Sequence, residues 1–244
     1  MAISSNTLFQ FTAKRETLEA ILTSKYLWAR YCTEYYWDKY RFSLPMMCLC
    51  DIPLSQTATH IKHYGKFGIG ISKNWANKIT ELSTVIYTRR NSILYKKVLS
   101  ILKKHHSGDE LSTEECFLLS RVKKYSGNTY CCQNGKRELV KNVKFYDERE
   151  WRFIPTNLVS QDIIVETNQN QNENQIAGDN DKTKGIPTFE YDDIRYLIVK
   201  DDSERIKLID FIDNELKSKS KTKKKEKTLL KSKILTVKQI EEDF

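Results

Sequence analysis

The sequence predicts an α+β fold, with a mixed or antiparallel sheet and helices packed at its sides. Three observations lead to this prediction. β-prone runs occur near both ends of the 244-residue chain, segments with helical periodicity lie between them, and no internal repeat is present. Apolar residues make up 39% of the chain, which is enough for one packed core, so we expect a single domain over residues 1–244.

The chain opens with a predicted strand followed by a predicted helix. Leu8–Phe11 is a short β-prone run. In the next segment, Glu16–Tyr26, the residues Leu18, Ile21 and Leu22 have the i, i+3, i+4 spacing of an amphipathic helix. We therefore expect a strand, a turn and a helix before residue 27.

The next third of the chain contains two further predicted strands. Leu44–Ser55 is nearly continuously apolar, which is typical of a central strand covered on both faces. Gln56–Tyr64 is compatible with a helix or a long loop, and Lys66–Ser72 alternates β-prone residues with glycine. Gly68 and Gly70 share one side of that strand, where the missing side chains allow another backbone or a ligand to approach.

Helical segments follow, and then the pattern returns to β. Ser72 is placed to cap a helix that begins after it. The periodicity over Ser92–Lys124, with a break at 107–108, predicts two helices. From Val143 onward, the alternation in FYDEREWRFIP predicts a strand with charged residues on one face.

Two polar segments interrupt the last part of the chain. The tract 168–185 is rich in Asn, Gln and Asp and predicts a disordered loop, and 217–233 predicts a lysine-rich loop. Between and after them, 192–200 is expected to form a strand, 203–216 a helix, and 233–244 a short strand and a helical turn.

The positive charge of the chain is concentrated in one segment. The net charge is +9, and residues 217–233 contain nine lysines and one glutamate, so this segment carries +8. Such a run attracts nucleic acid through phosphate contacts that weaken as salt rises. The alternative is a solvated segment without a partner.

The sequence also predicts the compartment. Its first residues do not show the basic segment followed by an apolar stretch that is typical of a signal peptide. No apolar window is long enough to cross a bilayer. Neither secretion nor membrane insertion is therefore expected. Cysteines without such a leader are typical of reduced thiols in a cytoplasmic protein. The cysteines are Cys32, Cys48, Cys50, Cys116, Cys131 and Cys132.

Four segments, in order along nearly the whole chain, resemble the AbiGi family of abortive phage resistance proteins. The segments are LFQFTAKRETLEAIL, MCLCDIPLSQTATHIKHYGKFGIGISKNWA, FYDEREWRFIP and SKILTVKQIEEDF. The resemblance implies a bacterial antiphage role of the abortive infection type. Members of that family are catalogued as antitoxins, which implies a toxin as partner.

A second resemblance concerns chemistry. The opening is similar to that of DarT-like ADP-ribosyltransferases, which have a His-Phe-Thr triplet before the first helix, and this chain has Gln10 in place of the histidine. The resemblance implies NAD as cofactor, with a glutamate that organises the nicotinamide ribose. It implies Glu150 and Glu148 as catalytic residues, and Gln10, Thr12, Tyr26, Tyr31, Gly68 and Gly70 around the dinucleotide.

Clustered charges near the predicted glutamates have two interpretations. Arg149 and Arg152 are suited to binding a pyrophosphate or a nucleic-acid phosphate, with His63 and Tyr64 at the edge of the same pocket. Alternatively, the charges pair with one another on a solvated strand. The rings between Tyr26 and Tyr40 likewise suit base stacking, a protein interface or core packing.

No metal site is expected. His60 and His63 have a spacing found among metal ligands on helices, but the paired-cysteine spacings of structural zinc sites are missing, and Cys48 and Cys50 lie in an apolar run. Two functions remain open from the sequence: an NAD-using antiphage effector, and a non-catalytic antitoxin that binds a toxin or nucleic acid.

Overall fold

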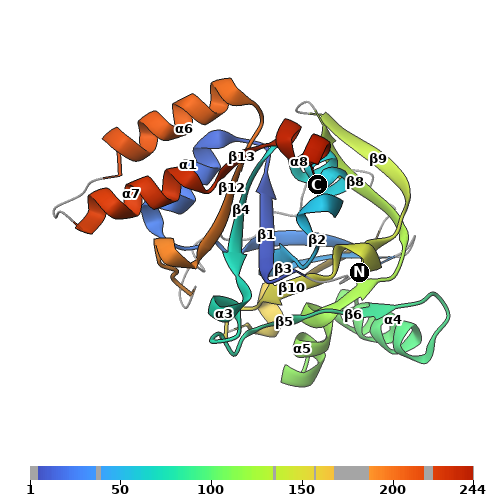
Figure 1. Ribbon diagram of the computed structural model, residues 1–244. Helices are drawn as coiled ribbons and strands as arrows, with labels where there is room; N and C mark the ends of the chain where they lie inside the picture. The colour runs from blue at the N-terminus through green and yellow to red at the C-terminus, as the bar shows by residue number, and fades with distance from the viewer. Residues whose placement is uncertain are drawn as a thin grey trace.

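The computed structural model confirms an α+β fold with a mixed sheet (Figure 1). It describes residues 5–36, 40–133, 136–156, 158–167, 187–216 and 222–243. The strands are β1 Thr7–Thr12, β2 Arg30–Tyr36, β3 Tyr40–Cys50, β4 Phe67–Ser72, β5 Leu82–Thr84, β6 Ile86–Thr88, β7 Val122–Lys124, β8 Gly127–Gln133, β9 Lys136–Val143, β10 Glu150–Phe153, β11 Ile164–Thr167, β12 Ile194–Val199 and β13 Ile234–Thr236. The helices are α1 Arg15–Ser24, α2 Ala58–Tyr64, α3 Lys73–Ala76, α4 Ile93–His106, α5 Thr113–Arg121, α6 Asp202–Asn214, α7 Thr222–Ser232 and α8 Val237–Asp243.

The main sheet has the strand order β13-β12-β4-β1-β3-β10-β5, and β2 and β11 also pair with β3. The pair β12 and β13 is parallel, whereas the other pairs of this sheet are antiparallel. The long apolar run of the sequence therefore forms the central strand, as predicted.

The sheet divides between β1 and β3. These strands share the register pair Phe9 and Cys50, and β1 then pairs along its whole length with β4. β3 instead pairs with β10 over 47–50 and with β2 over 40–46. The sheet is thus forked, with β1, β4 and β12 on one branch and β3, β10 and β2 on the other.

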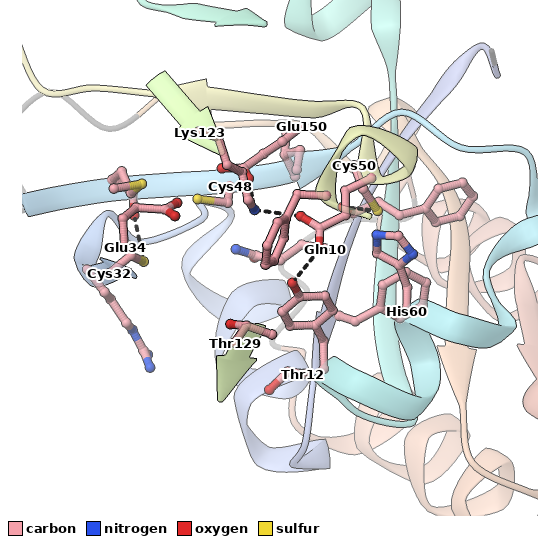
Figure 2. Close-up of a pocket in the computed structure, with 18 of the residues that line it drawn as sticks. Gln10, Thr12, Cys32, Glu34, Cys48, Cys50, His60, Lys123, Thr129 and Glu150 are labelled. Atoms are coloured by element: carbon pink, nitrogen blue, oxygen red, sulfur yellow. Dashed lines mark hydrogen bonds and ion pairs between the residues drawn. The ribbon is translucent and has the colours of Figure 1, made fainter. Parts of the chain in front are cut away.

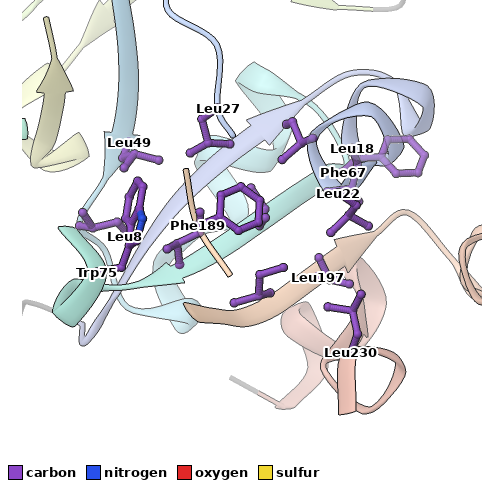
Figure 3. Close-up of a cluster of buried hydrophobic side chains, with 14 of the residues drawn as sticks. Leu8, Leu18, Leu22, Leu27, Leu49, Phe67, Trp75, Phe189, Leu197 and Leu230 are labelled. Atoms are coloured by element: carbon purple, nitrogen blue, oxygen red, sulfur yellow. The ribbon is translucent and has the colours of Figure 1, made fainter. Parts of the chain in front are cut away.

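Helices cover both faces of the branch built on β1. Leu8 packs with Leu18 and Leu22 of α1 in a cluster that also receives Leu208 of α6 and Leu230 of α7 (Figure 3). The next residue of β1, Phe9, lies on the other face in a second cluster, with Ile61 of α2 and Val237 and Ile240 of α8. This alternation is the period-two pattern of a strand buried on both faces.

The glycines of β4 accommodate aromatic rings of β1. Gly68 is paired with Phe11 and Gly70 with Phe9. A Cβ atom added at Gly68 would lie 2.9 Å from Cδ1 of Phe11, and one at Gly70 would lie 2.8 Å from Cε1 of Phe9. The close approach predicted for this strand is therefore made by phenylalanine side chains.

Three expectations about elements need correction. The second predicted helix ends at Arg121, and the last residues of that segment form β7. Residues 145–148 form a 3-10 turn rather than a strand, so β10 begins only at Glu150. The predicted loop 217–233 contains the helix α7, so that prediction is wrong for Thr222–Ser232, whereas the polar tract 168–185 lies outside the described residues.

Other local predictions are confirmed. Ser72 caps α3, because its Oγ accepts a hydrogen bond of 3.3 Å from the backbone N–H of Trp75. The predicted final strand and helical turn are β13 and α8. Within the described part of the chain, no helix combines the length and the apolar character that crossing a membrane requires.

Candidate functional site

A cavity of about 370 Å³ opens at the fork of the sheet, between the diverging ends of β1 and β3 (Figure 2). Gln10 and Thr12 of β1 line one wall, and Cys48 of β3 lines another. Further lining residues come from α1, α2, β2, β4, β7, β8 and β10 and from the 3-10 turn 145–148. Its size is within the range of small-molecule sites in proteins.

Glu150 is the centre of a buried network of charges at this cavity. Glu150 is only 5% exposed, and its two carboxylate oxygens accept hydrogen bonds from different cations. Oε1 accepts from Nε of Arg152, and Oε2 accepts from Nζ of Lys123 at 2.5 Å. Glu34 of β2 is ion-paired with the same guanidinium through Nη2. The network therefore connects β10, β7 and β2.

Glu148 extends the network toward the rim of the cavity. It accepts a hydrogen bond of 2.5 Å from Nζ of Lys123 and one of 2.7 Å from the hydroxyl of Tyr64. Burial of that hydroxyl and the neighbouring Glu148 carboxylate raise the pKa of Tyr64 well above its usual value. Tyr64 therefore stays protonated and acts as a hydrogen-bond donor at neutral pH.

The ion pairs keep the network charged despite its burial. Burial alone would raise the pKa of Glu150, but the adjacent Arg152 and Lys123 lower it well below its usual value. For Lys123, burial acts to lower the pKa, yet Glu148 and Glu150 raise it well above that of a free lysine. Glu150 is thus a carboxylate and Lys123 an ammonium at any physiological pH.

A local backbone feature sets the two glutamates around one lysine. Arg149 has a positive φ of 47°, in the left-handed region, and it separates the 3-10 turn that ends at Glu148 from the strand that begins at Glu150. Its carbonyl accepts a hydrogen bond of 3.1 Å from the N–H of Asp51, just after β3. The kink lets both carboxylates reach Nζ of Lys123.

Some of the residues predicted for the site lie around the cavity. They are Gln10, Thr12, Tyr64, Glu148 and Glu150. Other predicted residues do not line it: Tyr26, Tyr31, His63, Gly68, Gly70, Arg149 and Arg152. Arg152 is fully buried, and its remaining nitrogen, Nη1, donates to the carbonyls of Ser120 at 3.3 Å and Val122 at 3.2 Å. It positions Glu150 and leaves no nitrogen for a phosphate.

Residues that the sequence analysis did not select also line the cavity. Lys123 lies in a segment whose periodicity predicts a helix, although it belongs to the strand β7. Glu34 lies in β2, a strand that the sequence did not predict. Trp28, one of the rings between Tyr26 and Tyr40 that suit base stacking, lines the cavity with Arg30, and the guanidinium carbon lies 5.5 Å from the indole centroid. The β-prone residues of RYCTEYY, three tyrosines and a threonine, were the available signal for β2.

Metal ligands do not converge at this cavity. Among the described residues, no group of three or more His, Cys, Asp or Glu side chains has an arrangement that could hold a metal ion. His60, which lines the cavity, contacts the rings of Phe11 and Tyr64, with centroid separations of 6.3 and 5.7 Å. Besides carboxylates, cations, hydroxyls and aromatic rings, the lining contains the thiols of Cys32, Cys48 and Cys50, the imidazole of His60 and the amide of Gln10.

Comparison with known proteins identifies similar chains. The family model described as "Putative abortive phage resistance protein AbiGi, antitoxin" matches residues 25–200. A protein named abortive phage resistance protein AbiGi, from Lactococcus lactis subsp. cremoris, is 32% identical over 227 residues, which cover 82% of this chain and 89% of the relative. No solved structure matches the chain. The matched residues include the cavity walls from β2, β3, α2 and β10, whereas Gln10 and Thr12 precede them.

Proposed function

Because the chain belongs to the AbiGi family of abortive phage resistance proteins, we propose that it acts in phage resistance through the cavity at the sheet fork, which binds NAD. Glu150 then supports ADP-ribosyl transfer to an acceptor, or hydrolysis of the dinucleotide. The observation that carries the proposal is that the fork brings Gln10 and Thr12 of β1 to the same cavity as Glu148 and Glu150. These are four of the residues implied by the resemblance to DarT-like transferases.

The lining offers groups that suit the pyrophosphate, the ribose hydroxyls and one ring of a dinucleotide. Arg30 is exposed, and together with Lys124 it supplies positive charge for a pyrophosphate. Trp28 supplies a flat surface on which a base or a nicotinamide ring can stack. Gln10 and Thr12 supply hydrogen-bonding groups for ribose hydroxyls.

The chemical step follows from the position of the carboxylates. The bond between C1′ of the nicotinamide ribose and the ring nitrogen breaks, and its electron pair leaves with nicotinamide. The positive charge that develops at C1′ and the ring oxygen is stabilised by the permanently ionised Glu150. A hydroxyl of the acceptor, or water, forms the new C1′–O bond and releases one proton.

The test is calorimetric titration of the purified protein with NAD at moderate salt, followed by measurement of nicotinamide release. We expect binding in the micromolar range for the wild type, and release that falls at least a hundredfold in Glu150→Gln. Glu114→Gln, which changes an exposed glutamate of α5, is the matched control and should behave as the wild type. Absence of binding up to millimolar NAD contradicts the proposal.

The structure also favours a second candidate function, a non-catalytic antitoxin. Both carboxylate oxygens of Glu150 are already held by Lys123 and Arg152, as in a network whose role is structural. In this case the protein binds a toxin, and the lysine-rich helix α7 contributes contacts to nucleic acid. Co-expression separates the functions: an effector slows the growth of its host and Glu150→Gln relieves that effect, whereas an antitoxin is harmless alone and protects against its toxin.

A further inference from the structure

Glu34 of β2 has one carboxylate oxygen that no other residue of the described structure holds. Arg30, Cys32 and Glu34 alternate along β2 and all line the cavity, and Figure 2 shows Cys32 and Glu34 on its wall. Oε1 of Glu34 accepts a hydrogen bond from Nη2 of Arg152. Oε2 has no hydrogen-bond or ion-pair partner among the described residues, and it is not one of the atoms that are cut off from solvent. The side chain is 16% exposed, so this oxygen is accessible on a residue of the cavity wall.

The other carboxylates that line the cavity have no such oxygen. They are Glu148 and Glu150, and Oε2 of each accepts a hydrogen bond from Lys123. Oε1 of Glu150 accepts from Arg152, and Oε1 of Glu148 accepts from a tyrosine hydroxyl. A carboxylate whose two oxygens are held by cations is stabilised in its ionised form and is a poor proton acceptor. Within the described lining, Glu34 is therefore the carboxylate with an oxygen available for a proton.

Arg152 holds Glu34 next to Glu150. Its Nε donates to Glu150 and its Nη2 donates to Glu34. These nitrogens are neighbours on a planar guanidinium, so the two carboxylates bound to them lie side by side. Nη1 donates to two backbone carbonyls, which fixes the guanidinium in the core. The two glutamates thus occupy the same part of the cavity wall.

The balance of charge in the network also suits a proton acceptor. The network contains three carboxylates, Glu34, Glu148 and Glu150, and two cations, Lys123 and Arg152. It therefore has one carboxylate more than it has cations. A proton on Glu34 removes this excess negative charge, whereas a proton on Glu150 would weaken its pairing with both cations.

We infer that Glu34 is a catalytic residue whose Oε2 accepts the proton of the water or hydroxyl that attacks C1′ of the nicotinamide ribose. The inference rests on the proposed function, because it needs NAD in the cavity. A lone pair of the attacking oxygen forms the bond to C1′, the electrons of its O–H bond stay on that oxygen, and the proton moves to Glu34. Nicotinamide leaves with the electron pair of the bond that breaks. Glu150 stabilises the developing positive charge, and Glu34 removes the proton.

Glu34→Gln tests this role, because the amide keeps an oxygen for Arg152 but does not take up the proton. The reaction to follow is NAD hydrolysis, measured as nicotinamide release. The variant should bind NAD within twofold of the wild type, while its turnover should fall roughly a hundredfold or more. Glu166→Gln is the matched control, because Glu166 is ion-paired with the buried Arg41 and does not line the cavity. Its turnover should equal that of the wild type.

Azide distinguishes a proton acceptor from a residue that only holds Arg152 in place. Azide has no proton to lose, so its nitrogen can form the bond to C1′ without Glu34. Sodium azide should therefore restore nicotinamide release in Glu34→Gln and yield ADP-ribose with azide at C1′, which mass spectrometry detects. Azide should not restore release in Glu150→Gln, where the charge that develops at C1′ is no longer stabilised.

A second variant covers the case in which Glu34→Gln does not fold, as judged by thermal denaturation. Glu34→Asp keeps a negative charge for Arg152 and withdraws the carboxylate from the attacking oxygen by one methylene. It should hydrolyse NAD more slowly than the wild type, and azide should again restore nicotinamide release.

The outcomes separate the two proposals. If the wild type hydrolyses NAD and Glu34→Gln does so at the same rate, the inference is overturned and the proposed function stands. If turnover falls but azide does not restore it, the inference is likewise overturned, because Glu34 then acts only through Arg152. If the wild type binds no NAD, the proposed function fails and this inference fails with it.

Discussion

At the scale of single residues, the protein concentrates its buried charge in one place. Glu150, Lys123 and Arg152 are all buried, and each is paired with at least one of the others. Buried ion pairs contribute little net stability compared with apolar residues, yet removal of one partner is strongly destabilising. Glu150 and Lys123 of this network line the cavity, so the proposed function and the stability of the fold depend on the same residues.

The lowered pKa of Glu150 predicts a pH-dependent contribution to stability. Because the folded-state pKa lies below the ordinary value of 4.5, the ionised carboxylate stabilises the fold fully above pH 4.5, and this contribution is lost as the pH falls below 4.5. Glu150→Gln lacks the contribution. The free energy of unfolding of the wild type should thus exceed that of the variant by a constant amount near pH 7, and the gap should narrow below pH 4.5.

Urea denaturation at several pH values between 7 and 3 measures this gap. Glu241→Gln, which changes an exposed glutamate of α8, is the control and should match the wild type throughout. A gap between wild type and Glu150→Gln that stays constant down to pH 3 would show that Glu150 is not held ionised by its neighbours.

The sequence placed some residues at the cavity but not others, for a physical reason. Gln10, Glu148 and Glu150 were selected from similarity to motifs, and they line the cavity. Lys123, which completes their network, comes from a strand of three residues that follows a helix without a break in periodicity. Three residues are too few to show the alternation of a strand, and the ion pairs that fix Lys123 are long-range contacts.

At the scale of elements, the contact between β1 and β4 depends on the absence of side chains at two positions. Gly70→Ala should destabilise the protein by about 1–3 kcal/mol, because the new Cβ would lie 2.8 Å from both Cε1 of Phe9 and Cγ2 of Thr7. The midpoint of urea denaturation measures the effect. In a Phe9→Leu background, which removes one of the two clashing groups, the same substitution should cost less.

Equal cost in both backgrounds would contradict the role assigned to the Phe9 ring.

The sequence showed that this strand allows a close approach, but it could not show what approaches. The answer depends on the register between β1 and β4, which pairs Phe9 with Gly70 and Phe11 with Gly68. Register is set by tertiary packing, and a shift of one residue would reverse every side chain.

At the scale of the whole molecule, α7 contributes a net charge of +4 to the surface, from five lysines and one glutamate. Lys224 and Lys225 are exposed on this helix. If α7 binds nucleic acid, changing both lysines to glutamine should weaken binding at low salt. The slope of log Kd against log salt concentration should also fall, by roughly 0.7–0.9 for each phosphate that is no longer neutralised. Fluorescence anisotropy with a labelled oligonucleotide measures both.

The matched control places the same change in charge on another helix. Lys96 and Lys97 are exposed on α4, and changing both to glutamine should affect binding less than the α7 variant does. Equal effects from the two helices would show that the attraction comes from net charge alone.

The fold class was predictable because the strongest patterns belong to the core. The apolar run at β3, the amphipathic spacing of α1 and the apolar residues of β12 each belong to a segment that the structure packs into the core. The fork was not predictable, because it depends on where β3 leaves β1 and pairs with β10 and β2, far along the chain. The charge of the lysine-rich segment predicted a loop. Part of the segment instead forms α7, because Leu230 of this helix packs in the core.

The packing of α8 against α2 has a consequence for biosynthesis. The turn that carries His60 rests on Ile61, which shares a buried cluster with Val237 and Ile240, while β12 and β13 complete the branch of the sheet that contains β1. A ribosome synthesises the cavity walls early but residues 234–243 much later. The last residue that lines the cavity is Glu150, so the nascent chain contains every lining residue before Val237 and Ile240 are made, and the α2 wall gains its full packing only after that.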